Sequence, residues 1–196
     1  MAPTSSVSFP VSSSDTTEGT VYTSTLSYST DNWSTAQTVT VYGVDDTLSD
    51  DNQAFSVTLG SVTSSDVNYA GKNPDDVSVT NMDNETASIT VSALSGNTTE
   101  MGGTATFTVV LDSQPTSDVS IAVSSSDTSE ATISPSSLTF DSSNYSTLQT
   151  VTVTGVDDFY DDDNVSYTIT VDPSSSIASD NIMTSSTVTG SNIDND

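Results

Sequence analysis

The sequence contains no cysteine, no histidine and no arginine, and Lys72 is its single basic residue. Without histidine or cysteine the chain has no Ser-His or Cys-His pair for nucleophilic catalysis. We therefore expect that the protein is not an enzyme. One lysine cannot form the positive patch that binds phosphate, which excludes nucleic acid and anionic membrane surfaces as partners. No apolar run approaches the length of a membrane span, about 18 residues or more, so we expect no membrane insertion.

Acidic residues dominate the charge of the chain. There are 27 of them, the formal net charge is -26, and only 32% of the residues are hydrophobic. High charge with low hydrophobicity is typical of disordered chains. Here, however, the apolar residues alternate with serine and threonine, which indicates strands.

The chain is a tandem repeat. Asn32–Asp46 returns as Asn144–Asp158, and Asn81–Glu85 returns as Asn192–Asp196 at an offset shorter by one position. A period of about 110 residues suits one β-sandwich domain per repeat. We expect residues 1–86 to form a repeat that lacks its N-terminal strands, and residues 87–196 to form a complete repeat.

The second repeat predicts a two-sheet antiparallel sandwich. Apolar residues alternate at period two in 104–111, 119–123 and 166–171, and we expect seven or eight strands, with a turn at 172–174. The expected core residues are Ile89, Val91, Phe107, Val109, Leu111, Val119, Ile121, Leu138, Phe140, Val151, Val153, Tyr167 and Ile169.

Thr98–Phe107, Asp127, Gly155–Asp158 with Asp161–Asp163, and the closing Asp194–Asp196 together resemble a Calx-beta domain. More closely, they resemble the Ser/Thr-rich Calx-beta-like repeats of large bacterial surface proteins and adhesins. The resemblance implies tandem Ig-like Greek-key β-sandwiches with calcium-binding loops at one pole, in an extracellular or cell-surface protein. The implied ligands of the second repeat are Glu100, Asp127, Asp157, Asp158, Asp162, Asp194 and Asp196, and those of the first are Asp15, Asp45, Asp46, Asp51, Asp83 and Glu85.

Acidic side chains, which offer only oxygen ligands, favour calcium or magnesium independently of that family. Ca²⁺ takes six to eight oxygen ligands, and this chain offers softer metals neither histidine nor cysteine. Two carboxylates about 4 Å apart repel by about 4 kcal/mol at an effective dielectric constant near 20. Several such pairs would rival the stability of a domain, about 5 to 15 kcal/mol, unless a cation lay among them. The alternative is that the acidic loops spread into solvent and keep the chain soluble.

The position of one acidic motif suggests a mechanical function. Asp83, Asn84 and Glu85 lie where the first repeat ends and the next begins, so an ion there would tie neighbouring repeats together. We expect a calcium-stiffened spacer, an adhesin-like stalk, in a large extracellular protein.

The first repeat has no counterpart to Ile89–Leu111, so we expect it to present an open sheet edge and an uncovered apolar groove. Two explanations stay open. Either the chain is a fragment that begins inside a repeat, or copies assemble into an extracellular fibre by donating strands to one another.

Three further hypotheses about function follow from smaller features of the sequence. Paired loop carboxylates serve glycoside hydrolysis in some enzymes. The arrays Thr38–Thr40 and Thr150–Thr152 could order water on a flat face. Trp33 and Tyr145, at equivalent places, could stack on a sugar or cover the end of each sandwich.

Overall fold

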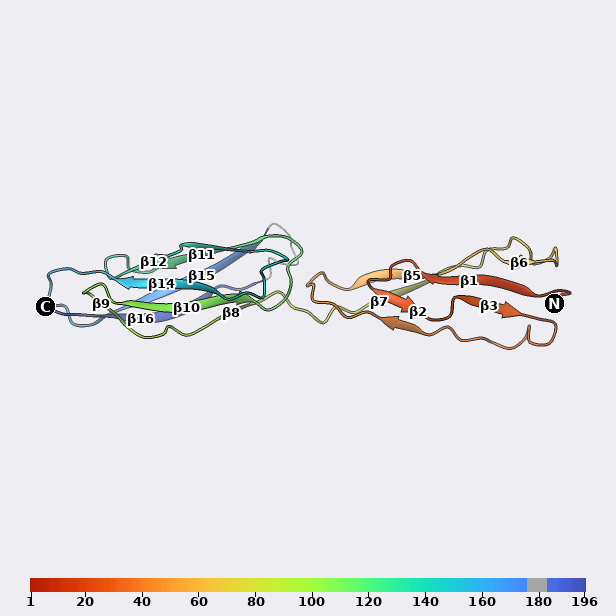
Figure 1. The fold of residues 1–196 in the computed structure, drawn as a ribbon, viewed down its shortest axis with the longest axis horizontal. Coiled ribbons are helices and arrows are strands. Elements are labelled where there is room, and N and C mark those ends of the chain that lie inside the picture. Colours follow the sequence, from red (N-terminus) through yellow and green to blue (C-terminus); the bar gives the residue numbers. More distant parts are fainter. Residues whose placement is uncertain (176–182) are drawn as a thin grey trace. The chain divides into compact units, whose positions relative to one another are not determined.

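The fold is all-β. A computed structural model describes residues 1–175 and 183–196, and these residues form sixteen strands and no α-helix (Figure 1). The all-β prediction is therefore confirmed. Within the described residues, no helix is long and apolar enough to cross a membrane.

Contacts divide the chain into two compact units. The first comprises Met1–Asp46 and Asp51–Asp83, and the second comprises Thr47–Asp50 and Asn84–Asp196. The division at Asp83 lies close to the boundary expected from the repeats, after residue 86.

The first unit contains one larger sheet and a two-stranded ribbon. In the larger sheet the strand order is β3-β1-β5-β7, with β6 also paired to β1, and the ribbon is β2-β4. The strands are β1 (Val7–Ser13), β2 (Gly19–Val21), β3 (Thr25–Tyr28), β4 (Val41–Gly43), β5 (Gln53–Leu59), β6 (Thr63–Ser64) and β7 (Val77–Asn81).

The second unit contains two sheets, ordered β12-β14-β10-β8 and β13-β11-β15-β16-β9. Its described residues form nine strands rather than the seven or eight expected, because β9 is a pair of residues too short for the pattern to reveal. The strands are β8 (Ile89–Val91), β9 (Thr98–Thr99), β10 (Thr104–Leu111), β11 (Val119–Ser125), β12 (Ala131–Ser134), β13 (Ser137–Phe140), β14 (Gln149–Gly155), β15 (Val165–Ser175) and β16 (Ser186–Ile193).

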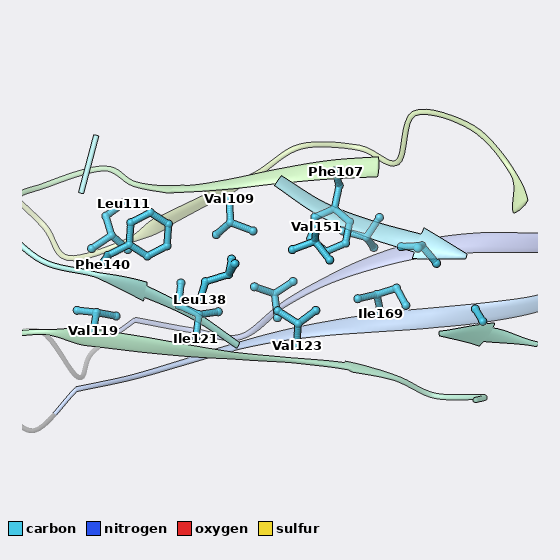
Figure 2. Close-up of a cluster of buried hydrophobic side chains, with 14 of the residues drawn as sticks. Phe107, Val109, Leu111, Val119, Ile121, Val123, Leu138, Phe140, Val151 and Ile169 are labelled. Carbon is cyan, nitrogen blue, oxygen red and sulfur yellow. The ribbon is translucent and has the colours of Figure 1, made fainter. Parts of the chain in front are cut away.

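The core of the second unit lies between its two sheets. Figure 2 shows Phe107, Val109 and Leu111 of β10 facing Val119 and Ile121 of β11. Eleven of the thirteen predicted core residues are buried, and the other two, on β8, are partly buried against the same cluster. Alternation of apolar and polar residues therefore predicted the inward faces of β8, β10, β11, β13, β14 and β15, because side chains of a strand point to opposite faces in turn.

The turn expected at 172–174 is wrong. Those residues continue β15, which runs to Ser175, and Pro173 lies opposite Ile121 of β11. Pairing of β15 with β16 ends at Val171, so Pro173 lies where β15 has no described partner on that side. Such an edge position tolerates a residue that lacks an N–H group.

One five-residue sequence takes different structures in the two units. Gln-Thr-Val-Thr-Val occurs at 37–41 and at 149–153. In the second unit it belongs to β14, which pairs with β10 on one side and β12 on the other. In the first unit only its last residue, Val41, lies in a strand, and the described residues place no strand where β10 would pair. Whether this five-residue sequence forms a strand therefore depends on a neighbouring strand with which it can pair.

A buried carboxylate fixes the N-terminal segment of the first unit. Asp66 is 5% exposed, and its Oδ2 accepts hydrogen bonds from the Thr4 N–H (2.8 Å) and hydroxyl (2.9 Å). Its Oδ1 accepts the N–H of Asn68 at 2.9 Å. The hydrogen bonds from the Thr4 and Asn68 N–H groups lower the pKa of Asp66 to about 2.

We expect Asp66→Asn to lower the thermal stability of the first unit at pH 6. Because the folded-state pKa is depressed, the stabilisation is present above the ordinary value of 3.8 and is lost as the pH falls toward about 2. The difference between variant and unsubstituted chain should therefore shrink between pH 4 and pH 2, as followed by emission of Trp33, the single tryptophan. Asp75→Asn, at an exposed position of the same unit, is the control. A pH-independent difference would contradict this role.

Candidate metal centre

Six carboxylates gather at one end of the second unit, where several strands begin or end (Figure 1). Glu100 follows β9, Glu130 precedes β12, Asp158 and Asp162 lie between β14 and β15, and Asp194 and Asp196 follow β16. They form two groups of three, and in each group one oxygen per residue lies within 4.8 Å of the others. Among the described residues these are the only such groups.

The first group consists of Glu100, Asp194 and Asp196. Glu100 is 2% exposed, and its N–H donates to the Ile193 carbonyl oxygen at 3.1 Å, beside the parallel pairing of β9 with β16. Its Oε2 accepts the Asn195 N–H at 3.1 Å. Asp194 in turn accepts the Asp196 N–H at 2.9 Å. The segment Asp194–Asp196 is thus folded around the side chain of Glu100.

The second group consists of Glu130, Asp158 and Asp162. Glu130 is 5% exposed, and its backbone carbonyl accepts the Val156 N–H at 3.0 Å, which holds it beside the loop that follows β14. Glu130 was not among the ligands predicted from the sequence. The signal was present, because Asp127–Glu130 repeats Asp15–Glu18 at the offset that relates Asn144 to Asn32.

A buried asparagine connects this end of the unit to the core. Asn192 Nδ2 lies 3.4 Å from Glu130 Oε2 and donates to the Val156 carbonyl oxygen at 2.9 Å. Its Oδ1 accepts the Thr98 hydroxyl at 3.0 Å, and that hydroxyl lies 3.1 Å from the Tyr167 hydroxyl. A Cβ at Gly155 would overlap Asn192 Oδ1, so only glycine lets the asparagine reach this place.

The carboxylates perturb one another. Burial raises the pKa of Glu100 against the opposing hydrogen bond from Asn195, and the charges of Asp194 and Asp158 raise it further. Burial likewise raises the pKa of Glu130, with contributions from the charges of Asp162 and Asp158. Burial and the charges of Asp158 and Asp194 raise the pKa of Asp162. Asp158 acts on both glutamates, so the two groups are one electrostatic site.

Two predicted ligands of this unit lie outside the two groups. The Ser129 hydroxyl and N–H bind the Asp127 carboxylate and lower its pKa, as expected for a residue that closes a turn. The side chain of Asp157 is exposed, and its Oδ1 lies 3.5 Å from Asn195 Nδ2. Both flank the site without completing a group of three.

The first unit retains part of this arrangement. Asn81 Nδ2 donates to the Val44 carbonyl oxygen at 2.7 Å and lies 3.3 Å from Glu18 Oε2, as its counterpart Asn192 does in the second unit. The Asp51 N–H donates to Asp83 Oδ2 at 2.9 Å. Asp51 has a φ of 66°, and its counterpart Asp163 has a φ of 61°, so the two loops share a left-handed residue.

The six predicted ligands of the first repeat do not form a group of three within the described residues; they are Asp15, Asp45, Asp46, Asp51, Asp83 and Glu85. The counterpart of Asp162 is Asp50, in the segment Thr47–Asp50 that belongs to the second unit. There the Gln114 N–H donates to the Thr47 carbonyl oxygen at 2.7 Å. Asp15 instead closes a turn, because its carboxylate accepts the Thr17 N–H at 2.9 Å.

No family model matches this chain, and no curated protein matches it. Among solved structures it is similar to SSP-19, an MSP-domain protein-like family member of Caenorhabditis elegans. That match has 17% identity, a TM-score of 0.34, and covers 50% of this chain and 91% of the other.

Two other similar structures are CBD12 from CALX1.2 and the calcium binding domain CBD12 of CALX1.1. The identities are 16% and 15%, the TM-scores 0.39 and 0.37, and each match covers 89% of this chain and 70% of the other. The all-β class of the present chain rests on its own strands.

We expect Glu130→Gln to raise the thermal stability of the second unit at pH 7 in a calcium chelator. The folded state raises the pKa of Glu130, so the ionised form is disfavoured, and stability is lost as the pH rises through the folded-state value. The gain should therefore vanish below the ordinary value of 4.5. Calorimetric unfolding of the full chain measures it, with Asp118→Asn, an exposed acid of the same unit, as control. A variant less stable than the unsubstituted chain at pH 7 would exclude this account of Glu130.

Proposed function

We propose that the second unit binds calcium through the two carboxylate groups at its acidic end. The observation that carries this proposal is that two buried glutamates, Glu100 and Glu130, each lie within 4.8 Å of two aspartates, in a unit with no lysine or arginine. A divalent cation would balance this charge, and no side chain of the unit can.

The donor set fits calcium. All six side chains offer oxygen, the ligand atom that calcium prefers, and carbonyl groups of the loops can add to them. Two oxygens on opposite sides of a calcium ion, each about 2.4 Å away, lie at most about 4.8 Å apart. The spacing within each group meets this limit. Histidine and cysteine, which softer metals prefer, are absent from the whole chain.

The proposed calcium site also has a stable frame. Glu100 is held by β9 and β16, and Glu130 by the Val156 N–H, so both glutamates stay in place while the aspartate loops close around an ion. The side-chain amide of Asn192 contacts Oε2 of Glu130, so the other carboxylate oxygen can coordinate calcium. Calcium would therefore connect four chain segments that the strands alone bring only to the same end.

We expect calcium to bind the full chain with a dissociation constant of about 0.1 to 1 mM, the range of extracellular calcium modules. Glu130→Gln combined with Asp158→Asn should weaken binding at least about tenfold, because charge count and ligand number both fall. Isothermal calorimetry measures both. Asp118→Asn removes one charge elsewhere in the unit and should leave the affinity nearly unchanged. Equal binding by the double variant would refute this site.

The wider role that we propose is that of a calcium-stiffened spacer in a large extracellular or cell-surface protein. Three features support it: the tandem repeat, the surplus of acidic residues, and the acidic pair Asp83 and Glu85 on either side of Asn84, where the contacts divide the chain. An ion bound by this pair would restrict the motion of one unit against the next.

A stiff spacer should lengthen in calcium. We expect the maximum dimension from small-angle scattering of the full chain to increase when calcium replaces chelator, and Asp83→Asn with Glu85→Gln to abolish the increase. Isothermal calorimetry of the same variant separates the two proposals, because the second-unit site should still bind. Identical scattering curves in calcium and in chelator would reject the stiffening role and leave the calcium site untouched.

A further inference from the structure

A buried asparagine belongs to the strand pair that carries the first carboxylate group. Asn192 of β16 is 1% exposed and lies opposite Thr98 of the parallel strand β9. Asp194 follows Asn192 by two residues, and Glu100 follows Thr98 by two residues, so the two acids leave the paired strands at the same level. The backbone of Asn192 therefore helps to set the distance between Glu100 and Asp194.

The side chain of Asn192 reaches the second carboxylate group. Its Nδ2 donates to the Val156 carbonyl oxygen at 2.9 Å and lies 3.4 Å from Glu130 Oε2. Val156 begins the loop that carries Asp158 and Asp162, so one amide contacts both segments that supply this group. Through its backbone and its side chain, Asn192 thus joins the four chain segments that carry the six carboxylates.

Buried hydroxyl groups fix the direction of this amide. The Thr98 hydroxyl donates to Asn192 Oδ1 at 3.0 Å, and the Tyr167 hydroxyl lies 3.1 Å from that of Thr98. Both hydroxyl-bearing residues are almost completely buried. An amide accepts through its oxygen and donates through its nitrogen, so the Thr98 donor directs the N–H groups of Asn192 toward Val156 and Glu130. A reversed amide would place its oxygen against two other acceptor oxygens.

The first unit repeats the same contact. Asn81 Nδ2 donates to the Val44 carbonyl oxygen at 2.7 Å and lies 3.3 Å from Glu18 Oε2. A Cβ at Gly43 would lie 2.6 Å from Asn81 Oδ1, and the glycine at the same place in the second unit makes room for its asparagine likewise. An amide taken out of water costs free energy unless it is hydrogen-bonded, and an apolar side chain of equal size would pack as well. Recurrence of this polar contact indicates positioning rather than packing.

We infer that Asn192 is the positioning residue of the acidic end, and that it acts through the carboxylates without being a ligand. The inference rests on the calcium site proposed above. Asn192 holds Glu130 and the loop after β14 at a fixed place relative to Glu100, so that an ion meets carboxylates that are already assembled. The hydroxyl groups of Thr98 and Tyr167 support the amide from the core. Loss of the amide would leave every ligand in the sequence and would loosen the segments that carry them.

Calcium titration of the full chain by isothermal calorimetry tests this role. The heat that disappears in the double variant Glu130→Gln, Asp158→Asn belongs to the second-unit site. Asn192→Ala should weaken the binding that produces this heat at least about tenfold, as loss of a residue that orients metal ligands does. Val119→Ala is the control, because Val119 is fully buried and lies opposite Ser175, at the other end of β15 from Asn192. It should lower the stability through a cavity and leave the affinity unchanged.

Two further variants separate positioning from charge and from folding. Asn192→Asp keeps the oxygen that accepts from Thr98 and replaces the donor N–H groups by a second oxygen. If charge alone decided the affinity, this added carboxylate would strengthen calcium binding, whereas a positioning amide predicts weaker binding. Tyr167→Phe removes only the supporting hydroxyl, at a position where the first repeat has Phe55. It should weaken binding about threefold, the effect of one weak hydrogen bond, and it carries the test if Asn192→Ala does not fold.

Hydrogen exchange in chelator gives a readout without any ion. The Val156 N–H donates to the Glu130 carbonyl oxygen, and the Glu100 N–H donates to the Ile193 carbonyl oxygen. Both amides should exchange at least about tenfold faster in Asn192→Ala, because the segments that they join open locally more often.

Four results would overturn the inference: unchanged affinity in Asn192→Ala or in Tyr167→Phe, an equal loss of affinity in Val119→Ala, tighter binding by Asn192→Asp, or unchanged exchange at the two amides. Each of these leaves the calcium site standing if the double variant loses its heat. A double variant that keeps all of its heat would refute the calcium site, and the positioning role would fall with it.

Discussion

Pairing of β10 with β14 is the interaction on which the second unit depends. It places Phe107, Val109 and Leu111 over the opposite sheet, and Val151 and Val153 are fully buried beside them. The first unit carries the same five-residue sequence without that neighbour, and there Gln37–Thr40 forms no strand. Strand propensity is equal in the two copies, so the tertiary partner decides the outcome.

The same segment also completes the acidic end of the sandwich. Residues 87–111 contain β8, which covers the core, and Glu100, which stands between β9 and β10 as the centre of one carboxylate group. The first unit has no counterpart to either. The first unit therefore lacks the glutamate of one group, whereas Glu18, Asp46 and Asp50, the counterparts of the other group, are present but do not form a group of three within the described residues.

Sequence patterns predicted those features that depend on local alternation or on repetition. The all-β class and the inward faces of the main strands of the second unit belong here. Glu100, Asp194 and Asp196 were predicted as ligands only through the resemblance to Calx-beta domains; the structure brings their carboxylates together, and their binding of an ion stays a prediction. Glu130 was missed because one glutamate in a turn looks like ordinary surface until its carbonyl is seen to fix the loop at Val156. The continuation of β15 through Pro173 was missed because it depends on where the neighbouring strand β16 begins, at Ser186. The residues around Pro173 carry no signal of that position.

The asymmetry between hydrophobic and charged interactions explains how so acidic a chain folds. The core cluster of the second unit consists of apolar side chains alone, so the strands that carry it set the positions of Glu100 and Glu130 independently of charge. Their carboxylates are then held where burial and neighbouring aspartates raise their pKa values. When the carboxylates of such a site are ionised they repel one another. Protonation at low pH, or a divalent cation bound at neutral pH, would reduce this repulsion. The packed core and the acidic loops are therefore linked, because packing holds in place the carboxylates of the cation site that we propose.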